Sequence, residues 1–465
     1  MHDLPTPQGR QHDVVYMTGR GHHVILGTAG TGKTVMAVHR AAHLADPRTQ
    51  NSGPTLLLTY TNSLVAYLRH FAADLPGVTV ETYGRFGRGY LTARGRMGYR
   101  QIATPTQRHY YVEQAVKATA ATYRPSPFFD RTTDFFLDEL EWIDGNGLAT
   151  LSDYLAVRRV GRMEPLQPSQ RQAIWAIRTN YLAARTTAGL PYDWAGVPSA
   201  VRAALADDAQ PRRYKHIVVD EAQDLSPEAI RSLAAAIPAA GSLTLFADYA
   251  QQIYGQRVSW RSCGLTVAKT EEFLDNYRNS PEIARLAIAM GEMPHFQDSA
   301  DLVEPRAPQR AAGARPTLVR YSSTEVEAQG VAANADSFGK VSRVGILTRT
   351  RAEARSASRG IPGARALHDN LDQWEITAGV YAGTYHSAKG LEFDVVFLPF
   401  CGADRCPDPE TVAAFGHDEA AARESRLLYV GVTRARDELI ITHTGELTPL
   451  LPSAGSGLYQ VTVAP

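Results

Sequence analysis

The chain has 465 residues, of which 44% are hydrophobic and 21% are charged, and this balance predicts a globular protein of two to four domains. No run approaches the roughly 20 apolar residues of a membrane span, and the three cysteines predict neither a disulfide framework nor a zinc or iron–sulfur site. The first residues, MHDLPTPQGRQHD, lack the pattern of a secretion signal, so we expect a cytoplasmic location and no membrane partner. Forty-eight basic residues balance forty-eight acidic ones, which argues against passive coating of nucleic acid but leaves room for a local basic groove.

Short apolar runs recur along the chain and predict strands that are covered on both faces. They lie at 24–26, 55–59, 216–219, 243–246, 344–347 and 394–398. Most are followed by a helical pattern, and this alternation predicts parallel sheets of the α/β class. Residues from about 85 to 210 instead predict mainly helices, and residues from about 292 to 316 predict a surface connection. The economical interpretation is two α/β units with a mainly helical insertion in the first.

The first predicted strand runs into a phosphate-binding pattern. Gly27-Thr28-Ala29-Gly30-Thr31-Gly32-Lys33-Thr34 precedes the helical segment TVMAVHRAAHLA, which is the GxxxxGK[ST] signature in the context that it requires. Its glycines let successive backbone N–H groups face phosphate oxygens, with help from the helix N-terminus. Lys33 is expected at the β- and γ-phosphates of ATP, and the Thr34 hydroxyl at Mg²⁺. A glycine-rich turn before a helix is the alternative, but a full match by chance is rare.

A carboxylate pair ends the strand predicted at 216–219. Asp220 and Glu221 stand there, where Asp220 is expected to act on the metal and Glu221 on the attacking water. Taken alone, the segment could be a strand that runs into an acidic turn. Together with the phosphate loop, it predicts a Mg²⁺-dependent nucleotide hydrolase.

These segments resemble the superfamily 1 helicases of the UvrD/Rep type, because VVDEAQD at 218–224 is similar to motif II of that group. The remaining motifs resemble those of the family and follow in the family's order. Segments similar to motif Ia, to the next strand-contacting motif, and to motifs III, IV, V and VI lie at 58–62, 81–86, 247–255, 274–278, 384–393 and 426–436. Motifs I, II, V and VI are the most specific of the set.

The resemblance implies a site for ATP and Mg²⁺ between two RecA-like P-loop NTPase domains. The implied catalytic residues are Lys33, Asp220, Glu221, Gln251, Arg278 and Arg434, and the implied metal ligands are Thr34 and Asp220. The implied nucleotide-binding residues are Gln11, Gly27, Thr28, Ala29, Gly30, Thr31, Gly32, Lys33, Thr34, Tyr277, Arg278, Glu392 and Arg434. Among them, Gln11 would read adenine, Tyr277 would stack on it, and Glu392 would contact the ribose. Gln251 would sense the γ-phosphate, and Arg434 would be the arginine finger.

The resemblance also implies contacts with a single strand of nucleic acid. The implied contact residues are Thr59, Tyr60, Asn62, Thr82, Tyr83, Tyr254, Trp260, Thr384 and His386. Tyr60 and Tyr254 stand where an aromatic ring is useful for stacking on a base, although buried packing explains them nearly as well. Trp260 is displaced from its usual place in motif III, so base stacking and a core or loop role both stay open for it.

The implied domain organisation follows the motifs. The first RecA-like domain would comprise residues 1–84 and 211–270, with the mainly helical accessory insertion at 85–210, and the second would comprise 271–465. The family usually carries a second, sizeable helical subdomain between motifs IV and V. Here that stretch is reduced to a short residual insertion at about 352–379.

The function implied by the resemblance is that of a superfamily 1 DNA helicase or translocase, which hydrolyses ATP to move along a single strand with 3′→5′ polarity and unwinds duplex. The reduced architecture motivates an alternative, a nucleic-acid-stimulated ATPase or translocase subunit of a repair or anti-phage defence complex that unwinds weakly alone. A nucleotide-gated binding switch is a third hypothesis, and the full hydrolytic set argues against it. The expected partners are single-stranded or tailed duplex DNA, with RNA left open, and a protein partner in the alternative.

Overall fold

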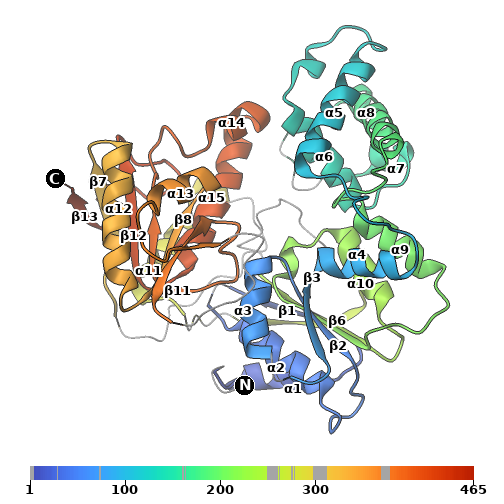
Figure 1. The fold of residues 1–465 in the computed structure, drawn as a ribbon, viewed down its shortest axis with the longest axis horizontal. Coiled ribbons are helices and arrows are strands. Elements are labelled where there is room, and N and C mark those ends of the chain that lie inside the picture. The colour runs from blue at the N-terminus through green and yellow to red at the C-terminus, as the bar shows by residue number, and fades with distance from the viewer. Residues whose placement is uncertain are drawn as a thin grey trace.

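Two parallel β-sheets form the framework of the protein (Figure 1). The computed structural model describes residues 5–28, 30–72, 75–159, 162, 164–248, 260, 262–273, 276, 278–296, 312–367 and 377–464. Every pairing between neighbouring strands of the two sheets is parallel, and helices cover them, so the α/β class predicted from the sequence is confirmed.

The first sheet has, in the described part of the chain, six strands in the order β3-β2-β4-β5-β1-β6. They are β1 (Gly21–Gly27), β2 (Thr55–Thr59), β3 (Val78–Thr82), β4 (His216–Val219), β5 (Ser242–Ala247) and β6 (Val267–Phe273). Strands β2, β4 and β5 are buried at every position, as a parallel sheet covered on both faces requires. The boundary predicted between residues 270 and 271 falls inside β6, which stays paired with β1 as far as Phe273.

The second sheet orders its strands β13-β7-β12-β11-β8-β10-β9. They are β7 (Thr317–Tyr321), β8 (Arg343–Thr348), β9 (Arg365–Leu367), β10 (Gly379–Thr384), β11 (Phe393–Leu398), β12 (Ala435–Thr444) and β13 (Gln460–Val463). The apolar runs predicted at 344–347 and 394–398 lie in β8 and β11, next to each other near the middle of this sheet.

Helices pack on both faces of each sheet. The helices with the first sheet are α1 (Arg10–Tyr16), α2 (Lys33–Ala45), α3 (Asn62–Ala72), α4 (Tyr83–Ala93), α9 (Val197–Ala206) and α10 (Pro227–Ala236). Those of the second unit are α11 (Pro281–Gly291), α12 (Thr324–Gly339), α13 (Arg351–Ala357), α14 (Pro409–Phe415) and α15 (His417–Thr433). Short 3-10 turns lie at Pro127–Asp130, Ala222–Asp224, Pro294–Phe296 and Ala454–Ser456. Among the helices that the structure describes, none is long and apolar enough to cross a membrane.

The helical insertion has a hydrophobic core of its own. It is formed by α5 (Pro105–Ala120), α6 (Thr133–Gly145), α7 (Leu151–Ala156) and α8 (Pro168–Thr187), which stand apart from both sheets (Figure 1). Helices α4 and α9 pack instead on the first sheet, where Phe86 and Val201 join a cluster with strand residues such as Leu58. The separately packed part of the insertion is therefore shorter than the predicted range 85–210.

Candidate functional site

The phosphate-loop lysine is buried against its own loop. β1 ends at Gly27, and α2 begins at Lys33, directly after Gly32, whose φ of 82° lies in the left-handed region that favours glycine. Lys33 Nζ donates 2.7 Å hydrogen bonds to the carbonyl oxygens of Gly27 and Thr28, and it lies 3.3 Å from Asp248 Oδ2. Charged phosphate oxygens are stronger acceptors than these carbonyls and would compete with them for the ammonium group.

The two residues predicted to hold a metal touch each other. Thr34, in the first turn of α2, donates a 2.8 Å hydrogen bond from Oγ1 to Asp220 Oδ2, at the end of β4. Burial, and then the neighbouring Glu221, raise the pKa of Asp220 to about 7. A cation beside this carboxylate would favour its ionised form, and a hydroxyl plus a carboxylate oxygen suits Mg²⁺, which usually binds one or two protein groups together with substrate phosphates. The donor set therefore fits the predicted metal. No group of three or more His, Cys, Asp or Glu side chains that could hold a metal by itself occurs among the described residues.

Positively charged residues from both α/β units act on Glu221. Its φ of 58° is a left-handed conformation that a non-glycine residue rarely adopts, and such strain is often found at functional sites. Burial disfavours the ionised carboxylate, but Lys389, Lys33 and Arg434 together hold the pKa of Glu221 below its ordinary value. The Gln223 amide donates a hydrogen bond to Glu221 Oε2, which fixes the direction of the carboxylate. Glu221 is thus a negative group surrounded by cations from two units.

The two predicted arginines of the second unit lie at this same place. Arg278 Nη2 forms a 2.5 Å ion pair with Glu392 Oε1. Arg434, at the C-terminal end of α15, is 1% exposed and donates to the backbone oxygens of Val430 at 3.1 Å and Leu391 at 3.3 Å. Burial, followed by the like charge of Arg278, lowers the pKa of Arg434 to about 10, while the carboxylates of Glu221 and Glu392 act in the opposite direction. The fold therefore brings together residues more than 150 positions apart.

A buried ion pair joins the two units, and sequence reasoning missed it. Lys389 Nζ donates to Asp224 Oδ1, and both side chains are almost completely buried. Burial raises the pKa of Asp224 to about 7, although Lys389 acts to lower it. Beside the pair, Gly390 packs so closely on Leu64 of α3 that a Cβ would lie 2.3 Å from a Leu64 methyl carbon. Asp224 and Lys389 lie inside the segments similar to motifs II and V, and this position in the motifs is the sequence feature that could have indicated the pair.

Gln11 lies against the phosphate loop. Its Nε2 donates a 3.0 Å hydrogen bond to the carbonyl oxygen of Thr31, and its Oε1 accepts one of 3.1 Å from the backbone N–H of Gln8. Gln8 thus touches Gln11 through its backbone N–H. Four predicted site residues lie outside the described residues: Ala29, Gln251, Tyr254 and Tyr277.

The predicted strand contacts of the first unit mostly serve their own elements. Thr59 is buried, and its hydroxyl has no hydrogen-bond partner in the described part of the chain. Thr82 caps the N-terminus of α4, and the hydroxyl of Tyr83 is 2.7 Å from a serine hydroxyl of α10. Asn62 begins α3, and Tyr60 just before it is 38% exposed. Of these five side chains, Tyr60 is the best placed to meet a ligand from solvent.

The predicted strand contacts at Thr384, His386 and Trp260 are also tied to the fold. Thr384 Oγ1 accepts a 3.2 Å hydrogen bond from a backbone N–H three residues ahead. Burial, and then the positive charges of Arg349 and Lys389, lower the pKa of His386 to about 4, so its ring is neutral near pH 7. Trp260 packs partly buried against the hydrophobic cluster of the first sheet.

Trp194 is an exposed aromatic residue that no sequence motif indicated. Half of its surface is exposed, and its ring lies over Gly84, where a Cβ would be 3.1 Å from a ring carbon. The preceding Asp193 is buried and accepts hydrogen bonds from the Tyr181 hydroxyl at 2.6 Å and the Gly196 N–H at 2.8 Å. The ring therefore stands on a fixed segment beside the start of α4, where the segment 81–86 resembles a strand-contacting motif.

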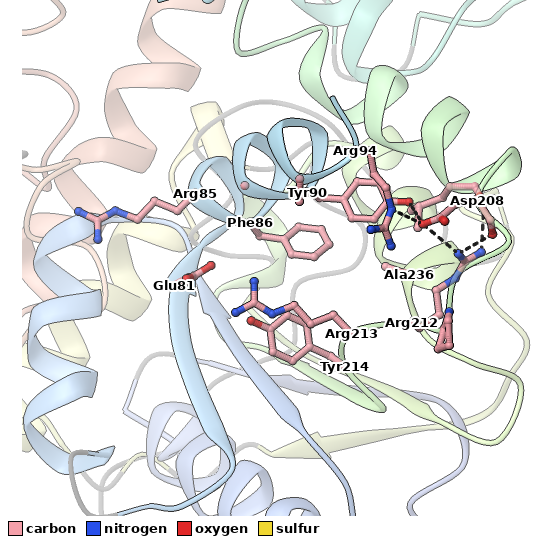
Figure 2. Close-up of a pocket in the computed structure, with 14 residues that line it drawn as sticks. Glu81, Arg85, Phe86, Tyr90, Arg94, Asp208, Arg212, Arg213, Tyr214 and Ala236 are labelled. Atoms are coloured by element: carbon pink, nitrogen blue, oxygen red, sulfur yellow. Dashed lines mark hydrogen bonds and ion pairs between the residues drawn. The ribbon is translucent and has the colours of Figure 1, made fainter. Parts of the chain in front are cut away.

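A second feature of α4 is a pocket of about 140 Å³, which we call the arginine pocket (Figure 2). It is lined by Glu81, Arg85, Phe86, Gly89, Tyr90, Ala93, Arg94, Leu205, Asp208, Pro211, Arg212, Arg213, Tyr214 and Ala236. Four arginines stand against two carboxylates, so the lining is positive, although Arg94 is paired with Asp208 at 2.8 Å. Arg213 lies over the ring of Tyr214 at 5.1 Å. The neutral chain thus carries a local basic region next to the segment 81–86.

Comparison with known proteins agrees with this arrangement of motifs. A family model described as an AAA domain matches residues 11–257, and the model of the UvrD-like helicase C-terminal domain matches residues 361–446. The ATP-dependent DNA helicase UvrD2 of Mycobacterium bovis is 24% identical over 552 aligned residues, which cover 91% of this chain and 76% of that protein. A probable DNA helicase II homolog of Rickettsia conorii is 34% identical over 23% of this chain and 16% of its own length. The ATP-dependent DNA helicase PcrA of Staphylococcus aureus is 37% identical over 17% of this chain and 10% of its own length.

The two matched regions contain the phosphate loop and the carboxylate pair on one side, and Glu392 and Arg434 on the other. They thus carry the residues that the fold brings together around Glu221. The chain therefore belongs to the superfamily 1 helicases of the UvrD/Rep type and is an ATP-hydrolysing enzyme.

Proposed function

We propose that this protein is an ATP-dependent DNA helicase and translocase, which moves along single-stranded DNA with 3′→5′ polarity and unwinds duplex. The observation that carries the proposal is the convergence on Glu221 of Lys33 from the first unit with Lys389 and Arg434 from the second. A nucleotide bound between the units would be contacted by both, so that ATP binding favours closure and hydrolysis favours opening. Contacts with the strand that alternate with closure would become steps along it.

The moving units of this proposal are two RecA-like domains. The first consists of residues 1–84 and 211–270, with the insertion at 85–210, and the second consists of residues 271–465. The pairing of β6 supports ending the first domain at Phe273. The separate hydrophobic core of α5 to α8 supports a shorter insertion.

The proposed chemistry divides the charges between the units. Glu221, ionised and oriented by its neighbours, would accept a hydrogen bond from the attacking water. Lys33, Arg278 and Arg434 would neutralise charge that develops on the transferred phosphoryl group. Thr34 and Asp220 would hold Mg²⁺, which when bound neutralises charge on the phosphate oxygens.

The proposed nucleoside contacts come from both units as well. Gln11 would contact adenine, and Tyr277 would stack on it, while Gln251 would sense the γ-phosphate. Glu392 would contact the ribose, and for this its carboxylate must share or release the ion pair with Arg278 that is present here.

The proposed DNA contacts combine aromatic rings with local positive charge. Tyr60 and Trp194 offer exposed rings on which bases can stack, and the arginine pocket supplies a basic region on α4. The relatives named DNA helicases favour DNA over RNA as the strand. Replacing Arg213 by alanine should weaken binding of single-stranded DNA irrespective of sequence and lower the salt dependence by about one released ion. Arg48→Ala, which removes an exposed arginine elsewhere in the first unit, is the matched control.

The alternative proposal is a nucleic-acid-stimulated translocase subunit that unwinds weakly alone. The observation that favours it lies between the segments similar to motifs IV and V. In the described residues of the range 352–379, the structure shows only α13, β9 and the first residue of β10 as regular elements. A second accessory subdomain is therefore not visible in that described stretch, and a partner protein would supply the missing function.

One experiment tests the motor, and a second separates the two proposals. ATP hydrolysis should rise about tenfold or more when single-stranded DNA is added, within the usual range of coupling between two sites. Equal rates with and without DNA or RNA would reject both motor proposals and favour a nucleotide-gated switch. Strand displacement on 3′-tailed and 5′-tailed duplexes then separates the two proposals. Unwinding of the 3′-tailed duplex supports a helicase of the proposed polarity. Stimulated hydrolysis without unwinding supports a translocase subunit of a larger complex.

A further inference from the structure

We infer that Asn279 is a positioning residue for ATP hydrolysis, which holds the backbone around Arg434 and the backbone of Arg278 in one fixed arrangement. This inference rests on the proposed roles of the two arginines. Asn279 directly follows Arg278 in the chain, and its side chain is 1% exposed. None of the sequence motifs assigned it a role.

The amide of Asn279 fastens the chain on both sides of Arg434. Its Nδ2 donates hydrogen bonds to the carbonyl oxygen of Thr433 at 3.3 Å and to that of Ala435 at 2.6 Å. The backbone N–H of Ser280 continues the connection with a 2.9 Å hydrogen bond to the carbonyl oxygen of Arg436. Because α15 ends at Thr433 and β12 begins at Ala435, these bonds fix the bend from which the Arg434 side chain leaves.

The same amide is joined to the backbone of Arg278 through a second asparagine. Asn279 Oδ1 accepts a 2.9 Å hydrogen bond from Asn276 Nδ2. Asn276 Oδ1 in turn accepts from the backbone N–H of Arg278 at 2.9 Å and from that of Asn279 at 3.2 Å. Both side chains are buried and all their polar atoms are bonded, so the pair has one low-energy arrangement.

The asparagine pair also touches the phosphate loop of the first unit. At Gly30, whose φ is 80°, a Cβ would lie 2.1 Å from Asn276 Oδ1 and 2.9 Å from Arg278 Cβ. Only a residue without a side chain lets the loop approach this closely. A continuous set of contacts thus runs from the phosphate loop through Asn276 and Asn279 to the backbone around Arg434.

Removal of the Asn279 amide would loosen Arg434 without removing any group that touches ATP. The carbonyl oxygens of Thr433 and Ala435 would lose this donor, and buried unpaired polar groups drive local rearrangement. A displacement of about 1 Å in a catalytic group can lower the rate about 100-fold. Nucleotide binding, which we assign mainly to the loop at 27–34 and to Gln11, would be affected much less.

The test compares Asn279→Ala with Asn334→Ala, a matched control in α12 where an exposed asparagine donates 2.8 Å to Gly330 O. We expect Asn279→Ala to lower kcat at saturating single-stranded DNA by about 10- to 100-fold. KM and the affinity for a non-hydrolysable ATP analogue should stay within about threefold, because positioning mainly affects the transition state. A kcat within twofold of the control would overturn the inference.

A double-mutant cycle with Arg434→Ala separates positioning from a general structural effect. If Asn279 acts through the arginine, then Asn279→Ala changes kcat by less than about threefold in the Arg434→Ala background. Independent, multiplying losses would overturn the inference. If Arg434→Ala itself retained wild-type kcat, the proposed function of Arg434 would be rejected, and the inference for Asn279 would be rejected with it. If Asn279→Ala does not fold, Asn276→Ala replaces it as the test, because it removes the hydrogen bond to the backbone of Arg278. This variant must also lower kcat while leaving KM nearly unchanged.

Discussion

The nucleotide side and the strand-contacting side of this protein are built in opposite ways. On the nucleotide side, the predicted residues Lys33, Glu221 and Arg434 are buried and act on one another across the two units. On the strand-contacting side, most of the predicted residues serve their own elements: Thr82 caps α4, and Tyr83 bonds within the first unit.

This difference fits what each side is proposed to bind. A phosphoryl group in transfer is stabilised by fixed charges in a site from which water is excluded, so its residues are buried and paired before the ligand arrives. A moving strand must be gripped and released, which suits exposed rings and arginines whose contacts exchange with water. Burial is therefore the sign expected for the first kind of site, whereas exposure, as at Trp194, is the sign expected for the second.

The largest effect is expected at Lys33, which bonds to two carbonyl oxygens of its own loop and lies close to Asp248. Lys33→Ala should reduce ATP turnover below detection, because it removes the cation proposed for the β- and γ-phosphates. Phosphate release at saturating ATP and single-stranded DNA is the measurement. Lys340→Ala, whose side chain is 72% exposed directly after the end of α12, is the control and should keep the wild-type rate. Measurable ATP turnover in Lys33→Ala would contradict the proposal that Lys33 is a fixed catalytic charge of the nucleotide side.

Arg434→Ala should lower kcat by about a thousandfold, as removal of an arginine finger does, with little loss of ATP binding. Arg434→Lys should recover only part of the rate, since an ammonium group lacks the planar fork of guanidinium. Arg436→Ala is the matched control: this neighbouring arginine is more exposed and is 3.3 Å from Asp394 Oδ1. Retained hydrolysis in Arg434→Ala would show that another residue is the finger.

Breaking the ion pair between the units should destabilise the protein. Lys389→Met leaves Asp224 buried without its cation, which should lower the free energy of unfolding by about 3 kcal/mol in a urea titration. The double variant Lys389→Met/Asp224→Asn should recover most of this loss, because no unpaired charge remains. A single variant as stable as the wild type would mean that the two units are not held together at this point.

Trp194→Ala should lower the affinity for single-stranded DNA by about tenfold, since stacking of one base contributes about 1–3 kcal/mol. Trp194→Phe should retain most of the affinity, and the basal ATP turnover of both variants should stay unchanged. Fluorescence anisotropy with a labelled oligonucleotide measures the effect, and Tyr99→Ala removes an aromatic that is 86% exposed elsewhere on the first unit. If both aromatic variants lose affinity equally, Trp194 has no special place on the strand path.

The smallest effect is expected from the pH dependence at His386. Its folded-state pKa is about 4, below the ordinary value of 6.5, so folding favours the neutral ring. This contribution to stability is fully present above pH 6.5 and is lost progressively as the pH falls toward 4. His386→Gln should therefore show a shallower loss of stability over that window in urea titrations at successive pH values. His109→Gln, at an exposed position, is the control, and equal slopes in all three proteins would exclude a neutral His386.

Consecutive residues determined a large part of the architecture. The six apolar runs predicted as strands lie in β1, β2, β4, β5, β8 and β11, because a strand covered on both faces needs an unbroken apolar run. The phosphate loop was equally readable, since its chemistry depends on adjacent backbone groups. The roles of Lys33 and Arg434 remain predictions that the experiments above test, and the role of Asp220 also remains a prediction.

Tertiary structure alone decided which distant residues meet. Nothing in the local pattern tells that α4 and α9 pack on the first sheet, that Lys389 pairs with Asp224, or that the Asn279 amide bonds to Ala435. The strand β12 was missed for a related reason: its partly exposed first half lacks an unbroken apolar run. The local sequence pattern indicates which segments are buried, because burial requires apolar residues. Contacts between distant segments depend on how whole sheets and helices pack, and the sequence around one residue does not identify its partner.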